Sequence, residues 1–344
     1  MADRGADLAR AYYGQVVRPL VEKRWPGLPH AAARLGGGSD VLGYDDEVSR
    51  DHDWGLRLDL LVEPSLVVPV DEHLARELPE TFAGHPTRFA TTWDPSARHG
   101  VAVNSVEEFA RGRLGFAASE PPSLDEWLSL TGQAALEVTA GPVFADSDGR
   151  LTAVRGRLRW LPDDVWRYAV ATDWVRVRDE LPFVARTGAS GDDLGSRLVT
   201  ARLVRVLAHL GYLLERRWPP YAKWFGRGFT ELSHAGRAHE QLLRALAGSG
   251  WAVREDALGA AAGILLAVQR DVGLPVVDTA VVPFFERGSR GIGLVPEAVA
   301  GGIVDDAVRA LPVGVGTVEQ WVDDVAVLMD PARRIRAARS MLDG

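Results

Sequence analysis

A run of small residues forms the first group in this chain that could do chemistry. Gly36 to Gly38 is followed directly by Ser39. Glycine lets a backbone approach a ligand closely and turn its N–H groups toward an anion. The segment therefore has the composition of a loop that holds a phosphate group.

Two aspartates, Asp51 and Asp53, follow Ser39 after eleven intervening residues, just before an apolar run bounded by glycine. This run favours a strand, and residues two apart on a strand point to the same face. Both carboxylates would then enter one site, while His52 points away. Paired carboxylates are ligands that Mg²⁺ prefers. A phosphate loop beside a magnesium pair is typical of phosphoryl or nucleotidyl transfer.

The spacing of these residues resembles the G-S…D-x-D signature of the DNA polymerase beta type nucleotidyltransferase superfamily. Residues 38–45 and 49–55 are more closely similar to a bacterial family in that superfamily, domain of unknown function 4037. Two later strings, residues 192–196 and 215–226, resemble the same family. The resemblance implies a nucleoside triphosphate bound at Gly38 and Ser39, and two Mg²⁺ ions held by Asp51 and Asp53.

A nucleotidyltransferase usually has a third carboxylate, which helps to take the proton from the attacking hydroxyl. The resemblance implies an acid near position 102, where this chain has Ala102. Asp59 would lie roughly 20 Å from Asp53 along an extended strand, so we do not expect it to serve. The alternatives are Asp94, Asp146 and Glu137, which follow the expected strands or neighbouring loops.

The second half of the chain offers Lys223, between Tyr221 and Trp224 and after two prolines. This stiff, aromatic and cationic corner suits a triphosphate or a stacked base, although Lys223 could equally be a solvated surface charge. Asp192 fits a helix N-cap slightly better than a substrate ligand. The segment 186–188 is compatible with either a phosphate contact or a turn.

Composition limits the class of protein. The chain has 344 residues, 47% hydrophobic and 25% charged, which is enough for two globular cores. It contains no cysteine, which excludes disulfides and thiol catalysis. There is no apolar run of about 18 residues and no basic-then-apolar leader pattern, so we expect a cytoplasmic protein without a membrane partner. The net charge of −8 disfavours a polyanion binder.

The element pattern predicts an α+β protein. A nucleotidyltransferase-fold mixed sheet with helices is expected over residues 1–152, and an all-helical bundle that binds substrate or nucleotide over residues 153–344. Strands are expected at 56–69, 88–93 and 100–106, helices at 6–24 and 70–78, and Glu107 and Glu108 should begin another helix. Turn residues 141–149 would close the first domain. Periodic apolar positions then predict helices at 162–181, 192–217, 235–247, 254–270, 296–310 and 317–342.

The leading hypothesis is a Mg²⁺-dependent nucleotidyltransferase that moves a nucleoside monophosphate to a hydroxyl. The acceptor would be a small molecule, as in the similar antibiotic nucleotidyltransferases, or a macromolecule. The alternative is a catalytically degenerate nucleotide-binding or interaction protein of the same fold, motivated by Ala102. Nucleic-acid modification ranks last, because only the short Arg216 to Trp224 string combines basic and aromatic residues.

Overall fold

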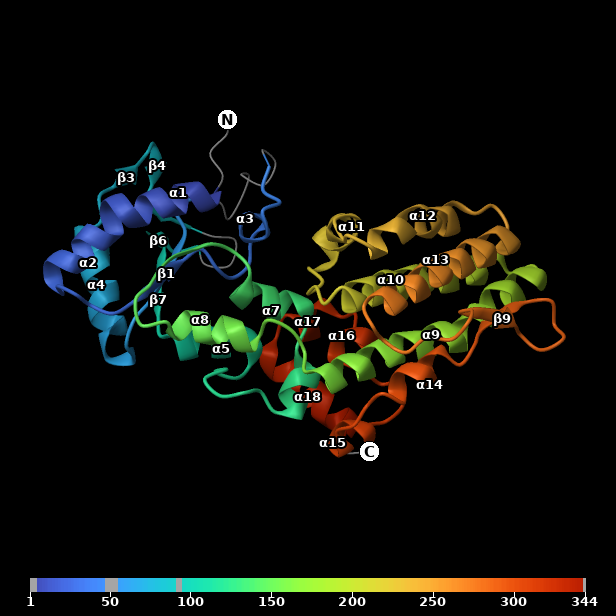
Figure 1. Ribbon diagram of the computed structural model, residues 1–344. Coiled ribbons are helices and arrows are strands. Elements are labelled where there is room, and N and C mark those ends of the chain that lie inside the picture. The colour runs from blue at the N-terminus through green and yellow to red at the C-terminus, as the bar shows by residue number, and fades with distance from the viewer. Residues whose placement is uncertain (1–4, 47–54, 91–94, 343–344) are drawn as a thin grey trace. The chain divides into compact units, whose positions relative to one another are not determined.

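The computed structural model describes residues 5–46, 55–90 and 95–342. Asp51 and Asp53, which are predicted to bind metal, and Asp94 therefore lie outside the described residues. The chain divides into two compact units, which are treated separately below (Figure 1). Unit 1 comprises Met1–Pro122 and Ala134–Arg159, and unit 2 comprises Ser123–Gln133 and Trp160–Gly344. The domain boundary expected at residues 152 and 153 stays a prediction.

Unit 1 is built on a mixed four-stranded sheet with the order β7-β2-β1-β8. The strands are β1 (Ala31–Ala33), β2 (Leu58–Leu61), β7 (Val101–Asn104) and β8 (Val143–Asp146). β2 and β7 run parallel, whereas β1 is antiparallel to both β2 and β8. The mixed sheet and the largely helical second half of the chain confirm the predicted α+β class.

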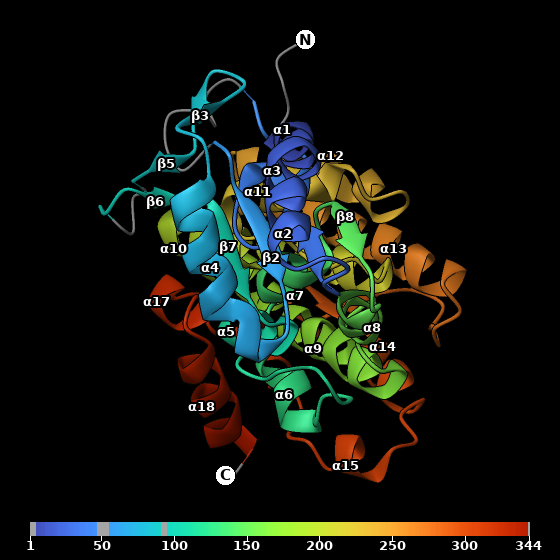
Figure 2. The same ribbon diagram turned by 90° about the vertical axis from the view of Figure 1, so that its left-hand side faces the viewer.

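One face of this sheet is covered by α1 (Gly5–Tyr12), α2 (Arg18–Arg24) and α4 (Val67–Glu77), as Figure 2 shows. Alternate strand residues enter the core beneath these helices, among them Leu58 and Leu60 of β2. Because side chains alternate along a strand, Asp59 points to the opposite face. The sheet therefore separates an apolar core from a face that carries a carboxylate.

The other elements of unit 1 are short. They are a π-helical turn (Tyr13–Val17), α3 (Ser39–Leu42), a 3₁₀ turn (Pro64–Leu66), β3 (Thr81–Phe82), β4 (His85–Pro86), β5 (Arg88–Phe89), β6 (Arg98–His99), α5 (Val106–Leu114), α7 (Gly132–Thr139, in this unit from Ala134 on) and α8 (Arg150–Arg157). The helix expected over 6–24 is thus split by a π-helical turn just before Pro19. Proline has no N–H to donate, which explains an irregular helix here.

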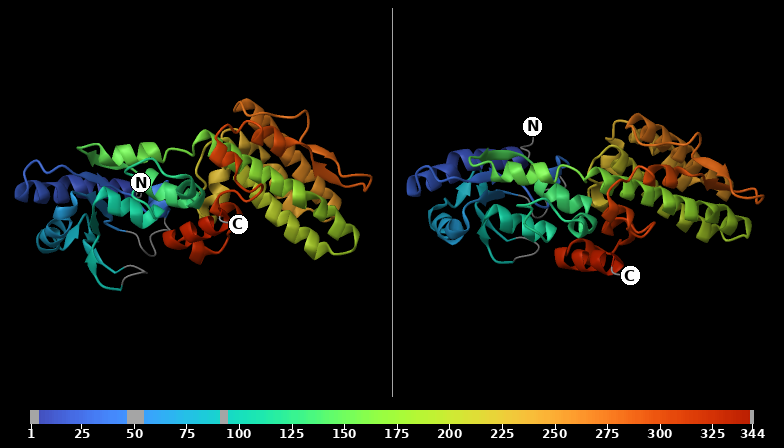
Figure 3. Two further views of the ribbon diagram at one scale, coloured as in Figure 1. Left: turned by 90° about the horizontal axis from the view of Figure 1, so that it is seen from below. Right: turned by 60° about the horizontal axis from the view of Figure 1, so that its bottom comes forward.

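Unit 2 is organised around α9 (Asp163–Ala189) and α10 (Asp193–Leu214), which lie side by side with α13 (Trp251–Asp271) (Figure 3). The first two helices are antiparallel. Trp166 Nε1 donates to the carbonyl of Leu213 at one end, and Ser196 Oγ donates to the carbonyl of Val184 at the other. These contacts fix which residues of the two helices face each other.

Shorter elements complete unit 2. They are α6 (Leu124–Ser129), α11 (Ala222–Thr230), a 3₁₀ turn (Ala235–Ala238), α12 (His239–Ala247), β9 (Val281–Pro283), β10 (Arg290–Ile292), α14 (Val295–Ala300), α15 (Asp306–Arg309), α16 (Val318–Trp321), α17 (Val325–Leu328) and α18 (Pro331–Leu342). Among the described residues, no helix is both long enough and apolar enough to cross a membrane.

Several local predictions were wrong. The strand predicted at 56–69 ends at Leu61, and residues 64–77 form a 3₁₀ turn and α4 instead. Residues 143–146, expected in a turn, form β8, because pairing with β1 satisfies their backbone. Residues 281–292, which lie between two predicted helices, form the β9–β10 hairpin. The helices predicted at 296–310 and 317–342 are each divided into shorter helices. The helix predicted to end at 181 continues through Pro182 to Ala189, because its buried face packs on α10.

Candidate functional site

The predicted phosphate loop is a glycine turn, Gly36 to Gly38, that links β1 to α3. Gly36 has a φ of +75° and Gly38 a φ of +147°, and both values favour glycine. Gly38 is the N-cap of α3, and Ser39 is its first residue. The turn therefore has the backbone geometry that its composition predicted.

The inside of the turn is filled by an ion pair of the chain itself. Arg34, only 2% exposed, donates from Nε to Asp40 Oδ2 at 2.7 Å and from Nη2 to Oδ1 at 2.9 Å. It also donates to the carbonyls of Leu35 and Gly37. A Cβ on Gly38 would lie 2.3 Å from Asp40 Oδ1, so glycine is required by this pair as well as by its φ. The buried pair holds the turn in one conformation.

A second guanidinium lies beside the turn. Arg113 Nη2 would be 3.2 Å from a Cβ built on Gly36, and Arg113 Nε lies 3.6 Å from Glu137 Oε2. The Gly36 N–H donates to the carbonyl of Glu137 at 2.8 Å. Because Arg113 is 41% exposed, it places positive charge where a solvent-borne anion can reach the turn.

Asp59 ties β2 to the same region. Its Oδ2 accepts a hydrogen bond from the Leu35 N–H at 2.8 Å. Burial raises the pKa of Asp59, and the guanidinium of Arg34 and the Leu35 N–H oppose part of that rise. The β2–β7 register pairs Asp59 with Ala102, so the two residues share one face of the sheet. The position where the resemblance implied a third acid thus lies beside a carboxylate on the neighbouring strand.

The two described alternatives for the third acid have different surroundings. Glu137 of α7 lies beside the glycine turn, with Oε1 3.8 Å from a Cβ built on Gly37. Asp146 instead accepts hydrogen bonds from the N–H and hydroxyl of Thr152 in α8. Within the ranges that the structure describes, no group of three or more His, Asp or Glu side chains could hold a metal ion. A magnesium site would therefore depend on Asp51 and Asp53.

The structure describes all the site residues that were predicted in the second half of the chain. Asp192 is the N-cap of α10 and accepts from the Gly195 N–H at 2.7 Å, which favours the capping interpretation. The segment 186–188 lies in the last turn of α9 rather than in a loop. Lys223 is exposed, and its Nζ lies 5.2 Å from the ring centroid of Trp224. It does not line the pocket described next.

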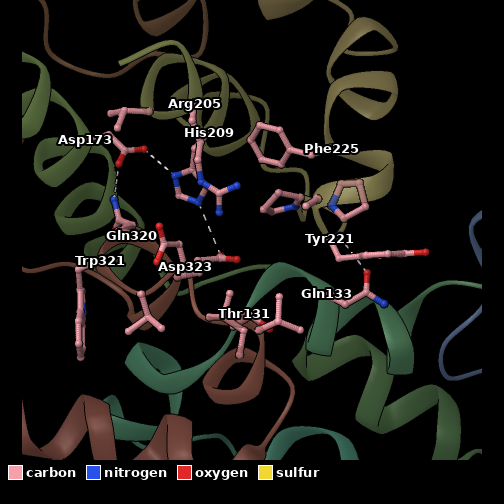
Figure 4. A pocket seen from close by; sticks show the side chains of 18 of the residues that line it. Thr131, Gln133, Asp173, Arg205, His209, Tyr221, Phe225, Gln320, Trp321 and Asp323 are labelled. Carbon is pink, nitrogen blue, oxygen red and sulfur yellow. Dashed lines mark hydrogen bonds and ion pairs between the residues drawn. The ribbon is translucent and has the colours of Figure 1, made fainter. Parts of the chain in front are cut away.

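Unit 2 contains a pocket of about 460 Å³. Its wall is formed by α9 and α10, by the segment 219–225 and by the segment 319–329, with Thr131 and Gln133 completing it (Figure 4). Aromatic side chains lie on two sides, Tyr221 and Phe225 on one and Trp321 on the other. The size and the mixed lining are those of a small-molecule site.

A buried polar network forms one end of this pocket. His209 Nδ1 lies 2.6 Å from Asp173 Oδ2, and His209 Nε2 lies 3.6 Å from Glu319 Oε1. Gln320 Nε2 donates to Asp173 Oδ1 at 2.7 Å, and Glu319 Oε2 accepts from the Gly132 N–H. Burial alone would lower the pKa of His209, but the carboxylates of Asp173 and Glu319 outweigh it and raise this pKa to about 10. The imidazolium therefore offsets the charge of one of these two carboxylates.

Two arginines lie next to this network. Arg176 follows Asp173 by three positions on α9, and Arg205 precedes His209 by four on α10, so each pair shares a helical face. Among the described residues, neither guanidinium has a carboxylate within ion-pair distance. Arg205 lies 5.5 Å from the ring centroid of Phe225. The pocket thus presents two cations whose charge is not balanced by a neighbouring carboxylate.

Sequence reasoning pointed to the corner at Tyr221, which lines this pocket, but missed the polar residues of α9 and α10. One sequence feature could have indicated these polar residues, namely a titratable residue within an otherwise apolar helical face. Asp173 within 165–177 and His209 within 203–214 are the two cases. Most of the other buried positions in these helices are occupied by uncharged residues, chiefly Val, Leu, Ala and aromatic residues. A charge at one of them predicts a buried partner, although the sequence does not say which residue the partner is.

Comparison with known proteins supports the resemblance over part of the chain. Residues 127–225 match the model of the family described as a domain of unknown function, DUF4037. No curated protein matches the chain. The crystal structure of a nucleotidyltransferase-like protein from Exiguobacterium sibiricum 255-15 is 13% identical over 78% of each chain, with a TM-score of 0.34, which is too low to support an argument.

The matched segment contains α9, α10 and much of the pocket wall, including Asp173, Arg176, Arg205 and His209. It also contains the strings 192–196 and 215–225 on which part of the resemblance rested. The glycine turn lies outside it. Residues 127–225 are therefore similar to the DUF4037 family, the family that the sequence resembles.

Proposed function

We propose that the chain is a Mg²⁺-dependent nucleotidyltransferase that transfers a nucleoside monophosphate from a nucleoside triphosphate to a hydroxyl. The observation that carries this proposal is the geometry of the glycine turn. It follows β1, lies against β2 through the Leu35–Asp59 hydrogen bond, and has the exposed guanidinium of Arg113 beside it. Positive charge beside a glycine-rich turn suits a polyphosphate, which would bind on the side of Arg113 because the Gly36 N–H is already bonded to Glu137.

In this reaction the acceptor oxygen bonds to the α-phosphorus, the bond from that phosphorus to the leaving pyrophosphate breaks, and the hydroxyl proton passes to a base. Gly38 and Ser39 would bind phosphate oxygens of the triphosphate. Asp51 and Asp53 would hold Mg²⁺, which supplies charge neutralisation at the phosphates. Glu137 suits the role of base because its carboxylate lies beside the turn. The acceptor would be a small molecule, aminoglycoside-like or other, or a macromolecular hydroxyl.

The test replaces both aspartates. The chain carrying Asp51→Asn and Asp53→Asn should lose transfer of label from α-labelled triphosphates, with Mg²⁺ present and a panel of hydroxyl acceptors. A double variant of exposed acids in the same unit, Asp7→Asn with Glu77→Gln, removes the same formal charge and should keep full activity. Unchanged turnover in the Asp51/Asp53 variant would contradict the assignment.

A second candidate is a catalytically degenerate nucleotide-binding or interaction protein. Ala102 favours it, because an alanine stands at the position where the resemblance implies the third carboxylate. Ala102 is exposed and pairs in register with Asp59. Calorimetric titration with the four common triphosphates separates the two functions. Binding that needs Mg²⁺, without product from any acceptor, would support the degenerate protein.

A further inference from the structure

In the antiparallel pair of α9 and α10, an acidic residue of α9 contacts a basic residue of α10 at two levels along the helix axes. At one level Asp173 contacts His209, and at the other Arg202 Nη2 lies 3.1 Å from Glu180 Oε1. Each of these contacts joins one acid to one base. The two levels are separated by about two turns of each helix.

Arg176 and Arg205 lie between these two levels, one on each helix. Arg176 is three residues after Asp173, and Arg205 is three residues after Arg202. Both line the pocket, and in the described part of the chain neither is paired with a carboxylate. Two guanidiniums at one level of a helix pair repel each other, and a bound anion removes that repulsion.

Two of the three acids that line the pocket, Asp173 and Glu319, are engaged elsewhere. Asp173 contacts His209 and Gln320, and Glu319 accepts from the Gly132 N–H and faces His209. Their charge is directed at the buried imidazolium. The third acid, Asp323, is exposed and, among the described residues, forms no ion pair with Arg176 or Arg205. The two guanidiniums are therefore available to an anionic group of a ligand.

We infer that this pocket binds a small organic phosphate, with the phosphate group between Arg176 and Arg205 and the organic part against Tyr221 and Phe225. A phosphate monoester carries nearly two negative charges at neutral pH, which matches two guanidiniums, whereas one carboxylate would leave one of them unbalanced. The ring of Phe225 also holds the guanidinium of Arg205 in place. The volume of about 460 Å³ is too large for inorganic phosphate alone.

The experiment is calorimetric titration of the full chain in EDTA, on the Asp51→Asn, Asp53→Asn background. These conditions remove the proposed metal-dependent donor site, so the pocket is tested independently of the proposed function. The probes are adenosine 5′-monophosphate, ribose 5-phosphate, inorganic phosphate, adenosine and an aminoglycoside. Either phosphate ester should bind, inorganic phosphate should bind more weakly, and adenosine and the aminoglycoside should not bind.

Substitution of Arg176→Gln or Arg205→Gln should each weaken binding of the phosphate ester about tenfold or more, and the double variant about 100-fold. Arg197→Gln is the matched control on α10, because Arg197 is paired with Asp193 and does not line the pocket. The affinity of the Arg197→Gln chain for the phosphate ester should stay within about twofold of that of the parent chain. Binding of no phosphate ester, equal binding of adenosine, or equal affinity in the double variant would overturn the inference.

A second measurement does not require variants that fold. Phenylglyoxal modifies accessible arginines, and mass spectrometry reports the rate at each residue. A bound phosphate ester should slow modification of Arg176 and Arg205 on the native chain and leave Arg197 unchanged. Equal rates with and without a saturating phosphate ester would also overturn the inference.

Discussion

The imidazole of His209 and the carboxylate of Asp173 form a buried ion pair between α10 and α9, with 2.6 Å between Nδ1 and Oδ2. Both side chains are largely withdrawn from solvent, at 10% and 1% exposure. A buried charge that loses its partner is strongly destabilising. The pair therefore gives unit 2 a stability that depends on pH.

The free energy of unfolding should fall as pH rises from about 7 to about 10. The pKa of His209 is raised from 6.5 to about 10 in the folded protein, against the carboxylates of Asp173 and Glu319. Below pH 6.5 both folded and unfolded chains hold the proton, so the stabilisation is fully present there. Between pH 6.5 and about 10 only the folded chain holds the proton. Each pH unit in this range therefore removes up to about 1.4 kcal/mol of the stabilisation.

Urea denaturation at pH 7, 8 and 9 measures this slope. The His209→Asn variant should be less stable at pH 7 by about 3–5 kcal/mol, because Asp173 loses its cation. Its stability should also change less with pH than that of the native chain. Parallel pH profiles for the two proteins would contradict the raised pKa.

Replacement of Arg34 by lysine should lower the free energy of unfolding. Its guanidinium makes a two-bond pair with Asp40 and donates to two carbonyls of the glycine turn. Lysine keeps the charge but not the planar fork, so Arg34→Lys should cost about 1–3 kcal/mol of unfolding free energy. Arg111→Lys, which changes an exposed pair with Glu108, should cost less than about 0.5 kcal/mol. Equal costs in urea denaturation would show that the fork geometry is unimportant.

Gly38 and Gly43 flank α3 and allow a matched comparison. Both have a positive φ, of +147° and +74°. A Cβ on Gly43 meets nothing within 4 Å, whereas a Cβ on Gly38 meets Asp40 and Arg34. Gly43→Ala should cost about 1 kcal/mol from backbone strain alone, and Gly38→Ala at least about 2 kcal/mol more. Thermal unfolding of the two variants measures the difference, and equal melting temperatures would rule out the clash.

Long-period patterns were predictable from the sequence, and short pairings were not. The apolar spacing of α9, α10 and α13 extends over many turns, so the helices could be located within a few residues, except for the last eight residues of α9. β8 has four residues, and what makes it a strand is its pairing with β1, more than a hundred residues away in the chain. A local pattern contains no information about such a partner.

The same distinction between local and long-range contacts decides which parts of the candidate sites could be predicted. The glycine turn was predictable because its conformation depends on adjacent residues, Gly36 to Gly38. The pocket of unit 2 depends on contacts between distant residues, such as His209 with Asp173 and Glu319. Capping of α10 by Asp192, which is local, was also anticipated.

A carboxylate restored at position 102 should increase catalysis if a missing acid limits it. Ala102 is exposed on β7 and pairs in register with Asp59, so an aspartate there would lie on the same sheet face about 4.8 Å away, strand to strand. General-base assistance contributes about 100-fold or more, so Ala102→Asp should raise Mg²⁺-dependent transfer by a measurable part of that factor. Ala97→Asp, at an exposed position before β6, is the control and should leave turnover unchanged. An Ala102→Asp chain that binds triphosphate and remains as slow as the native chain would show that the acid at this position is not what sets the rate.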